Sequence, residues 1–497
     1  SFIMFNDGFD NDKYFSLQTD RILKRISQFG GKLYLELGGK LFDDYHASRV
    51  LPGFKPDTKI NMLLRLKDKA EIVVVVSAAA IEQNKMRADL GITYDMDALR
   101  LIDAFRERGL YVGSVCITHY ASQPSADSFI KRLGELGIKV FKHFPIPGYP
   151  TNVKLIVSDD GYGKNEYIET SRQLVVITAP GPGSGKMATA LSQLYHDAKR
   201  GIKSGYAKFE TFPVWNLPLT HPVNLAYESA TADLNDVNMI DPFHLEAYGE
   251  TTVNYNRDVE IFPVLRRLFE EIYGECPYKS PTDMGVNMVG FCIYDDKAVR
   301  DAANMEVIRR YYDTLVKKMK GLCSADEVMK QELIMNQAKV TVEDRHVVRA
   351  ALDKAAATEG PAAAIELPDG RIVTGKTSAL LGSCSAALLN SLKALAGVDD
   401  SIHLISPSVI EPICELKLKT FSCHNPRLHV DEILIALAIS ATTDKNAKAA
   451  LDCLPMLTGC EAHSSVIVSH VDTDKFRKLG INLTCEPVYE SNKLFHR

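Results

Sequence analysis

Residues 175–197 read VVITAPGPGSGKMATALSQLYHD and predict a strand, a glycine-rich turn and a helix in succession. Similar β-branched runs precede this stretch, with helical patterns between them. We expect strands at 32–37, 71–76, 110–118, 138–144, 153–159 and 173–178, and helices at 94–109 and 125–137. Near-continuous Val/Ile runs are typical of a mostly parallel sheet with helices on both faces. The sequence therefore predicts an α/β fold.

The length of the chain predicts several domains, because 497 residues are too many for one hydrophobic core. We expect an α/β phosphate- or nucleotide-binding domain at 1–220, a mainly helical domain at 221–340 and a C-terminal α/β domain at 341–497. The elements expected beyond residue 220 are helices at 222–235, 262–274, 296–319, 324–337 and 379–396, a hairpin at 362–376 and a strand at 402–406.

Composition and charge narrow the class of protein. Lys+Arg 58 against Asp+Glu 63 gives a formal net charge of −5, so no basic excess recommends nucleic acid or an anionic membrane as partner. The longest apolar runs, at 72–76 and 433–439, are far shorter than the roughly 18 residues of a membrane span. The first residues lack a signal-peptide pattern, and the ten cysteines include no C-x-x-C pair. We expect a cytoplasmic protein with reduced cysteines, and homo-oligomerisation stays open.

The glycine-rich turn at 179–186 has the layout of a phosphate-binding loop. Gly181, Gly183, Ser184 and Gly185 leave the backbone free to approach an anion, and Lys186 opens a helix whose dipole favours negative charge. The loop departs from the standard P-loop at its first glycine position, which is a proline, and after the lysine, where a methionine replaces the usual hydroxyl ligand of magnesium. The alternative is a Pro/Gly-rich turn that only ends a core strand.

A second stretch matches the sequence pattern of a P-loop but does not meet its physical requirements. Residues 370–377 read GRIVTGKT, yet the residues between the glycines prefer extended structure. A turn sequence, LPDG, precedes them. We therefore expect residues 371–374 to pair as a strand of a β-hairpin.

Four other residues are candidates for the same site. Lys40 and Lys164 stand in glycine turns at expected strand ends and could converge with the loop lysine on one anionic ligand. Glu228 lies on a polar face of the expected helix 222–235 and is a candidate acid/base, with Lys164 as a second catalytic candidate. Glu210 follows the helix after the loop and could meet the ribose of a dinucleotide. No metal site is expected.

Several blocks of sequence resemble one uncharacterised bacterial family, which is known only as a domain of unknown function. The resemblance covers nearly the whole chain and rests on blocks at 35–54, 161–172, 179–197, 206–234, 278–291 and 459–472. Some members of that family carry the label ATP-dependent peptidase. The sequence contains no H-E-x-x-H and no G-x-S-x-G, so peptidase chemistry is not expected here.

The C-terminal region is similar in layout to the cytidine deaminase fold, with a hairpin, a loop and a helix that opens near Cys384. The resemblance implies a zinc ligand followed by a catalytic glutamate on that helix. Here Ser385 and Ala386 follow the cysteine, and the later P-C-x-x-C is missing. Zinc-hydroxide chemistry on a base needs those groups, so we expect the fold without the activity.

These observations favour a protein that binds a nucleotide or another phosphorylated small molecule, with ATP among the candidate cofactors. An ATP-dependent enzyme is the first hypothesis, and a dinucleotide-dependent oxidoreductase is its rival. A non-catalytic protein that senses a metabolite or takes part in assembly is the third.

Overall fold

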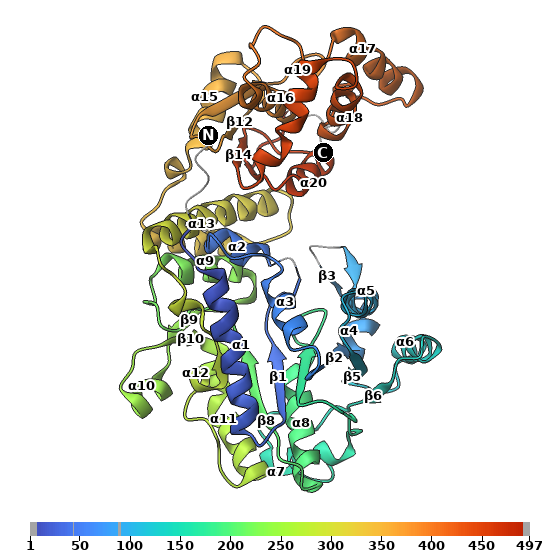
Figure 1. Cartoon of the computed structure of the whole chain (residues 1–497), viewed down its shortest axis with the longest axis vertical. Helices are drawn as coiled ribbons and strands as arrows, with labels where there is room; N and C mark the ends of the chain where they lie inside the picture. Colours follow the sequence, from blue (N-terminus) through green and yellow to red (C-terminus); the bar gives the residue numbers. More distant parts are fainter. Residues whose placement is uncertain (1–6, 43, 88–90, 491–497) are drawn as a thin grey trace. The chain divides into compact units, whose positions relative to one another are not determined.

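Seven parallel strands form one sheet in the computed structural model (Figure 1). The structure describes residues 7–42, 44–87 and 91–490. The strands are β1 (Leu33–Leu37), β2 (Ala70–Ser77), β5 (Val112–Thr118), β6 (Val140–Lys142), β7 (Leu174–Thr178), β8 (Gly205–Phe209) and β11 (Gly285–Val286). The predicted α/β class and five of the six predicted strands are confirmed, because the β-branched runs are buried on both faces of the sheet.

The strand order is β11-β8-β1-β7-β2-β5-β6. The late strand β7 therefore lies between the two earliest ones, and Val176 is in register with both Leu35 of β1 and Ile72 of β2. The connection after β1 leads over β7 to β2, whereas the connection after β7 leads over β1 to β8. Since such connections are right-handed, the two pass on opposite faces of the sheet.

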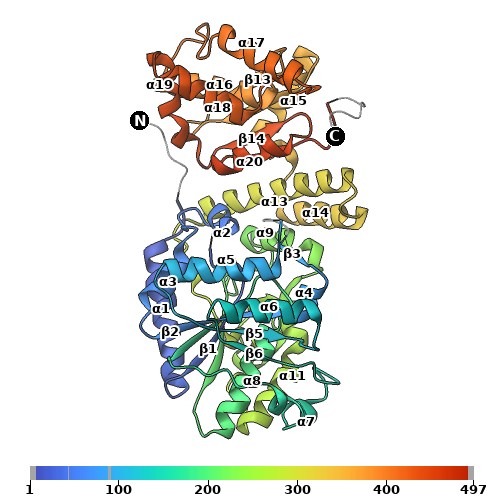
Figure 2. The ribbon, with the colours of Figure 1, turned by 90° about the vertical axis from the view of Figure 1, so that its right-hand side faces the viewer.

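One face of the sheet is covered by α7 (Val153–Ile156), α8 (Lys186–Lys199) and α11 (Asn256–Tyr273), which lie together in Figure 2. Their apolar side chains pack on Tyr34, Val175 and Ile177. The other helices of this part of the chain are α1 (Asn11–Gln28), α2 (Tyr45–Val50), α3 (Thr58–Arg65), α4 (Ala78–Glu82), α5 (Tyr94–Glu107), α6 (Pro124–Glu135), α10 (Pro242–Tyr248) and α12 (Pro281–Met284). Short antiparallel pairs are β3 (Met86–Arg87) with β4 (Ile92–Thr93), and β9 (Asn238–Ile240) with β10 (Val253–Tyr255).

The chain divides into two compact units. The N-terminal unit consists of Gly8–Tyr227 and Asn235–Arg300, and the C-terminal unit includes residues 228–234 and 301–490. The segment 221–340 is mostly helical, as expected, and is distributed over both units. Two helices, α9 (Pro222–Ala230) and α13 (Asp296–Met319), pass from one unit into the other.

The C-terminal unit contains a four-stranded mixed sheet. Its strands are β12 (Ala362–Glu366), β13 (Ile372–Lys376), β14 (Glu461–Ser464) and β15 (Asn482–Cys485), in the order β13-β12-β14-β15. The predicted hairpin is confirmed, since β12 and β13 pair antiparallel and the Arg371 carbonyl accepts from the Leu367 amide at 2.8 Å. The match GRIVTGKT is therefore a strand and not a phosphate loop. The helices are α14 (Ala325–Ala338), α15 (His346–Thr358), α16 (Ser383–Ala396), α17 (Pro407–Glu415), α18 (Val430–Ser440), α19 (Lys445–Asp452) and α20 (His470–Lys478).

A buried ion network holds the first residues of β14, an inner strand of this sheet. Arg345 is fully buried, and its Nη1 donates to Glu461 Oε2 at 2.6 Å while its Nη2 donates to the Ala462 carbonyl at 2.7 Å. Arg309 of α13 donates to the other oxygen of Glu461 at 2.5 Å. Burial opposes ionisation of Glu461, but the two arginines hold its pKa below the ordinary value. The network ties α13 and the start of α15 to β14.

Two predictions of secondary structure are wrong, and one predicted helix is too long. Residues 153–159 are not a strand, because Asn152 caps a short helix there by accepting the Leu155 amide. Residues 402–406 form no strand; Ser406 instead caps α17, whose first residue is a proline. The helix expected at 222–235 ends at Ala230 and is followed by a short 3-10 turn. Among the described residues, no helix is both long and apolar enough to cross a membrane.

Candidate functional site

The carboxyl ends of β1 and β7 form the place in this sheet where a ligand is expected. The connections after these neighbouring strands leave toward opposite faces, and ligands of open α/β sheets bind at the carboxyl edge beside such a pair of strands. The glycine-rich loop leaves β7 at this edge and leads into α8.

The loop has the predicted strand–glycine–helix geometry. Gly185 caps α8 with a φ of +89°, and no side chain accepts from the first turn of the helix. Gly183 has a φ of +72°. Both values lie in the left-handed region, which favours glycine. The amides of the first helical turn are therefore free to meet solvent or an anion.

Two hydroxyl groups fix the shape of the loop. Ser184 Oγ donates to the Gly181 carbonyl at 2.7 Å, and Thr118 Oγ1, at the end of β5, donates to the Ser184 carbonyl at 2.5 Å. The ring of Tyr94 packs on Gly181, where a Cβ atom would lie 2.4 Å from the phenol. Gly181 thus makes room for an aromatic ring as well as for the turn.

Lys186 points toward the end of β1. Its Nζ donates to the Leu37 carbonyl at 2.9 Å. Burial lowers the pKa of this amine, nearby Glu36 raises it and Lys208 lowers it further. The loop lysine therefore joins a group of charged side chains on the β1 and β8 side of the loop.

This group, the acid–base cluster, consists of Glu36, Lys186, Lys208, Glu210 and Asp258. Glu36 and Lys208 are in register on adjacent strands, and Lys208 Nζ lies 3.0 Å from Asp258 Oδ1 in the first turn of α11. Burial opposes the charge of Lys208, but Asp258 and Glu36 raise its pKa above the ordinary value. Tyr206 donates its hydroxyl to Glu36. The cluster lies on the sheet face that α8 and α11 cover.

Glu210 is the member with the most unusual titration. Burial raises its pKa to about 8; Lys208 lowers it, and Asp258 and Glu36 raise it. The carboxyl group packs on Gly285, where a Cβ atom would lie 2.4 Å from Oε2. Among the described residues no hydrogen bond to this carboxyl group is present. Burial of the Glu210 carboxyl group thus favours its neutral form.

The other candidates from the sequence belong to other segments than the cluster. Lys40 is exposed and follows β1 by three residues. Lys164 is exposed and ends a 3-10 turn, η1 (Tyr162–Lys164), which packs against the later turns of α8 through His196 Nε2 and the Tyr162 carbonyl, 2.9 Å apart. Glu228 belongs to the C-terminal unit, whereas the cluster consists of residues of the N-terminal unit. The structure thus joins Lys186 and Glu210 and keeps Lys164 apart from them.

Sequence reasoning missed Glu36, Lys208 and Asp258. A signal for the first two is present, because polar residues stand in phase with buried tyrosines on alternate positions of β1 and β8. No local pattern indicates Asp258, which reaches the cluster from a helix far along the chain.

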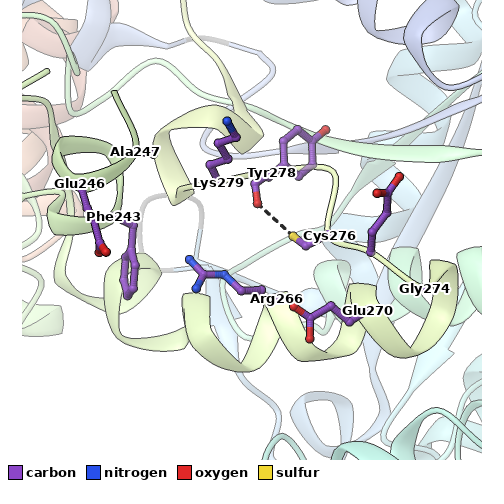
Figure 3. A pocket seen from close by; sticks show the side chains of 10 residues that line it. Phe243, Glu246, Ala247, Arg266, Glu270, Gly274, Cys276, Tyr278 and Lys279 are labelled. Carbon is purple, nitrogen blue, oxygen red and sulfur yellow. Dashed lines mark hydrogen bonds between the residues drawn. The ribbon is translucent and has the colours of Figure 1, made fainter. Parts of the chain in front are cut away.

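A separate hollow of about 610 Å³ lies between α10 and α11 (Figure 3). Arg266 covers its apolar floor, with the guanidinium 5.4 Å from the Phe243 ring centre and 4.9 Å from that of Phe262. Cys276 donates its thiol to the Tyr278 carbonyl at 3.1 Å, and burial raises the pKa of that thiol. Acidic and basic side chains are mixed around the hollow, and its cysteine is not a ready nucleophile.

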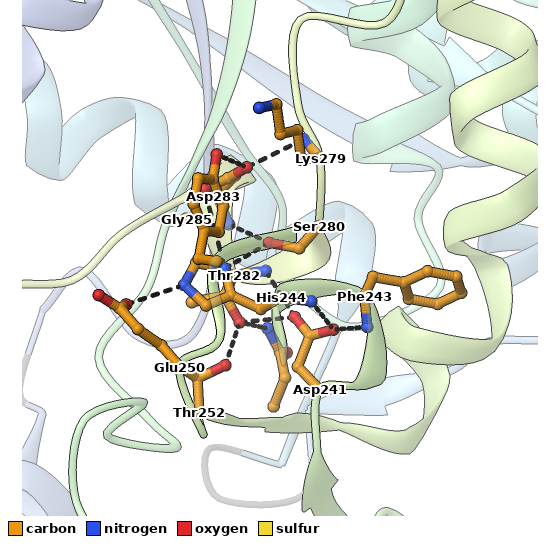
Figure 4. A network of polar contacts seen from close by, with 12 residues as sticks. Asp241, Phe243, His244, Glu250, Thr252, Lys279, Ser280, Thr282, Asp283 and Gly285 are labelled. Carbon is orange, nitrogen blue, oxygen red and sulfur yellow. Dashed lines mark hydrogen bonds and ion pairs between the residues drawn. The ribbon is translucent and has the colours of Figure 1, made fainter. Parts of the chain in front are cut away.

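In a polar network near α10, a histidine contacts a serine through one ring nitrogen and a glutamate through the other (Figure 4). His244 Nδ1 lies 2.7 Å from Ser280 Oγ, and its Nε2 lies 3.3 Å from Glu250 Oε2. A hydrolytic triad joins the same kinds of group. Ser280, however, is fully buried and its hydroxyl oxygen accepts the Asp283 amide at 3.1 Å, which caps α12. The network fixes α10 to α12 and offers no accessible nucleophile.

Within the described residues, no group of three or more His, Cys, Asp or Glu side chains is arranged to hold a metal ion. Cys384, at the start of α16, is buried, and burial raises its pKa well above the ordinary value. A thiol in this state is a poor metal ligand.

Comparison with known proteins places the whole chain in one group. Residues 7–339 match the family model described as "Domain of unknown function DUF1846, N-terminal", and residues 343–495 match its C-terminal counterpart. The chain is 58% identical over 490 residues to a UPF0371 protein of Streptococcus pyogenes serotype M3, covering 99% of each chain. It is 57% identical over 494 residues to a UPF0371 protein of Streptococcus thermophilus, covering 99% of this chain and all of the relative.

Proposed function

The chain belongs to the DUF1846 family, and from the chemistry of its site we propose that it binds a phosphorylated small molecule at the carboxyl edge of the large sheet and transfers a proton on it. Glu210 would be the proton-transfer group. The observation that carries the proposal is this carboxyl group, which has no hydrogen-bond partner among the described residues, packs on Gly285 and belongs to one cluster with Lys208 of β8 and the loop lysine Lys186. Burial raises its pKa to about 8.

The loop supports binding of an anion. The amides that open α8 have no side-chain cap, and the dipole of a 14-residue helix favours negative charge at this end. The residue after the lysine is Met187, so the loop lacks the hydroxyl that holds magnesium in a standard P-loop. A phosphorylated metabolite therefore fits the loop at least as well as ATP.

The acid–base cluster supports a proton transfer. A general acid or base works best when its pKa is near the pH at which it operates, and the carboxyl group of Glu210 meets this condition. Lys208, which acts directly on Glu210, and Lys186 of the same cluster would stabilise negative charge that develops on the ligand.

Thermal unfolding in the presence of inorganic phosphate, ribose 5-phosphate, ATP and NAD tests the binding. A ligand at 100 times its dissociation constant should add about 2.7 kcal/mol of stability. Lys186→Ala and Gly183→Ala should remove this gain. Lys131→Ala, an exposed lysine of α6, and Gly109→Ala, which carries the same backbone strain at a φ of +84°, are the matched controls.

The outcome separates the three hypotheses. Stabilisation by NAD alone, lost in Glu210→Gln, would favour a dinucleotide-dependent oxidoreductase. Tight binding of a phosphorylated ligand that Glu210→Gln leaves unchanged, without turnover in either protein, would indicate a metabolite sensor. If no phosphorylated compound stabilises the protein, or if the loop variants and the controls respond equally, the proposal is wrong.

A further inference from the structure

An arginine in the hollow between α10 and α11 has no polar partner among the described residues. The guanidinium carbon of Arg266 lies 4.9 Å from the ring centre of Phe262 and 5.4 Å from that of Phe243. The two rings are 5.1 Å apart, and Phe262 is fully buried. Figure 3 shows the guanidinium directed from α11 toward Phe243 of α10. Within the described part of the chain its N–H groups make no hydrogen bond or ion pair, so all of them are available to a ligand.

The aromatic floor orients this side chain. Glu270 follows Arg266 by four residues on α11, a spacing at which opposite charges can pair. No ion pair forms between these two described residues, and the guanidinium lies over the rings instead. A planar fork held in one orientation loses little freedom when it donates two N–H groups to one carboxylate. Arg266 is therefore oriented in advance for the carboxylate of a ligand.

The charges around the hollow indicate what else the ligand carries. The lining contains two cations and three carboxylates, namely Arg266, Lys279, Glu246, Glu270 and Glu275. Among the described residues, none of these charged groups forms an ion pair or a hydrogen bond. The formal charge of the lining is −1 (2 − 3). Three carboxylates disfavour a plain anion such as phosphate, and they favour a ligand with ammonium groups beside its carboxylate.

We propose that the hollow between α10 and α11 binds a basic amino acid, whose carboxylate lies on Arg266 and whose ammonium groups face the surrounding glutamates. A molecule with one carboxylate and two ammonium groups carries a single positive charge and neutralises the lining. The volume of about 610 Å³ lies within the range of roughly 300–1,000 Å³ that small-molecule sites occupy. This site goes beyond the proposed function, since Arg266 follows Asp258 of the acid–base cluster by eight residues on α11 (266 − 258), about 12 Å along the helix.

Isothermal titration calorimetry with L-lysine tests the site. L-Lysinamide, which lacks the carboxylate, and L-glutamate, which carries a second one, should each bind at least about tenfold more weakly than L-lysine. Arg266→Gln should weaken L-lysine binding about tenfold, because it removes two charge-assisted hydrogen bonds. Arg266→Lys should weaken it nearly as much, because an ammonium group keeps the charge but lacks the planar fork. Arg267→Gln, an exposed neighbour on α11 that does not line the hollow, is the matched control and should bind as wild type does.

Alkylation of Cys276 tests where the ligand lies. This thiol lines the hollow, so saturating L-lysine should slow its reaction with N-ethylmaleimide about tenfold, as peptide mass spectrometry would show. The partly buried Cys453 of the C-terminal unit should react at an unchanged rate.

Three results would overturn the site: wild type that binds no L-lysine, equal L-lysine affinity in Arg266→Gln and Arg267→Gln, or L-lysine binding that leaves the alkylation of Cys276 unchanged. Gly183→Ala should lose phosphate and keep L-lysine, because its change lies in the glycine-rich loop. Failure of the amino-acid site therefore leaves the proposed function standing, and failure of phosphate binding leaves the amino-acid site standing.

Discussion

The pH dependence of stability tests the state of Glu210 directly. In the folded chain the pKa of this carboxyl group is raised from 4.5 to about 8, first by burial and then by Asp258 and Glu36. Unfolding exposes the group to water and restores the ordinary value. Between these two pH values the folded state keeps a proton that the unfolded state has lost, so wild-type stability falls as the pH rises.

The size of the effect follows from the interval between the two values. From 4.5 to about 8 is about 3.5 pH units, and at about 1.36 kcal/mol per unit the upper limit is roughly 5 kcal/mol. The glutamine of Glu210→Gln is neutral in the folded and the unfolded chain, so the variant does not lose stability in this way as the pH rises. The unfolding free energy of the variant, minus that of wild type, should therefore grow from pH 5 to pH 8 and level off above.

Fluorescence of Trp215 is a suitable signal, because this is the only tryptophan of the chain and it lies in the same compact unit as Glu210. Its indole N–H donates to the Asn287 carbonyl at 2.7 Å, a contact that unfolding breaks. Urea unfolding is followed at one-unit steps from pH 5 to pH 9, with the exposed Glu135→Gln as control. If the curves of wild type and Glu210→Gln run parallel, the carboxyl group is already ionised at neutral pH and the reasoning is refuted.

Three further predictions concern the C-terminal unit. Glu461→Gln should cost about 3–5 kcal/mol in urea unfolding followed by circular dichroism, because it removes the carboxylate that two buried arginines share, whereas the exposed Arg349→Ala should cost less than about 1 kcal/mol. Since the pKa of Glu461 is lowered, its contribution is present above the unfolded value and should disappear as the pH falls through the folded one. Gly375→Ala should cost about 1–3 kcal/mol in calorimetry, because its Cβ atom would lie 2.1 Å from the Ala387 amide nitrogen of α16, and Gly360→Ala, with no atom closer than 3.9 Å, should be near neutral. Cys384→Ser should leave the zinc content of purified protein unchanged, as elemental analysis would show, because Cys384 belongs to no group of three or more His, Cys, Asp or Glu side chains arranged to hold a metal ion among the described residues.

The parts of the fold with strong local patterns could be predicted. The Val/Ile run at 71–76 and the hairpin around Asp369–Gly370 have one consistent reading, since burial on both faces and a turn sequence each leave few alternatives. The run at 153–157 is as apolar as a strand, yet it begins with a short helix. The side chain of Asn152 caps this helix by accepting a hydrogen bond from a backbone amide of its first turn. For short apolar runs, periodicity alone does not separate the two structures.

The candidate site could be predicted only in part, for a topological reason. The loop at 179–186 is recognisable because all its chemistry lies within one short segment. The acid–base cluster depends on β8 lying next to β1, and 172 residues separate the first residues of these strands along the chain (205 − 33). Lys208 and Glu210 come close to Glu36 only through that strand pairing.

The central position of β7 shapes how the protein is made. On a ribosome, β1 and β2 emerge long before the strand that must lie between them; 137 residues separate Leu37 from Leu174 (174 − 37). At about 5–20 residues per second, this segment takes roughly 7–27 s to synthesise. Until β7 is made, the edge of β1 and, once it has emerged, the edge of the valine-rich β2 have no native neighbour on the side that β7 will occupy. The nascent chain therefore carries two unpaired strand edges that are prone to aggregate. Residues 70–77 are the segment that a chaperone would need to shield until residue 178 has left the exit tunnel.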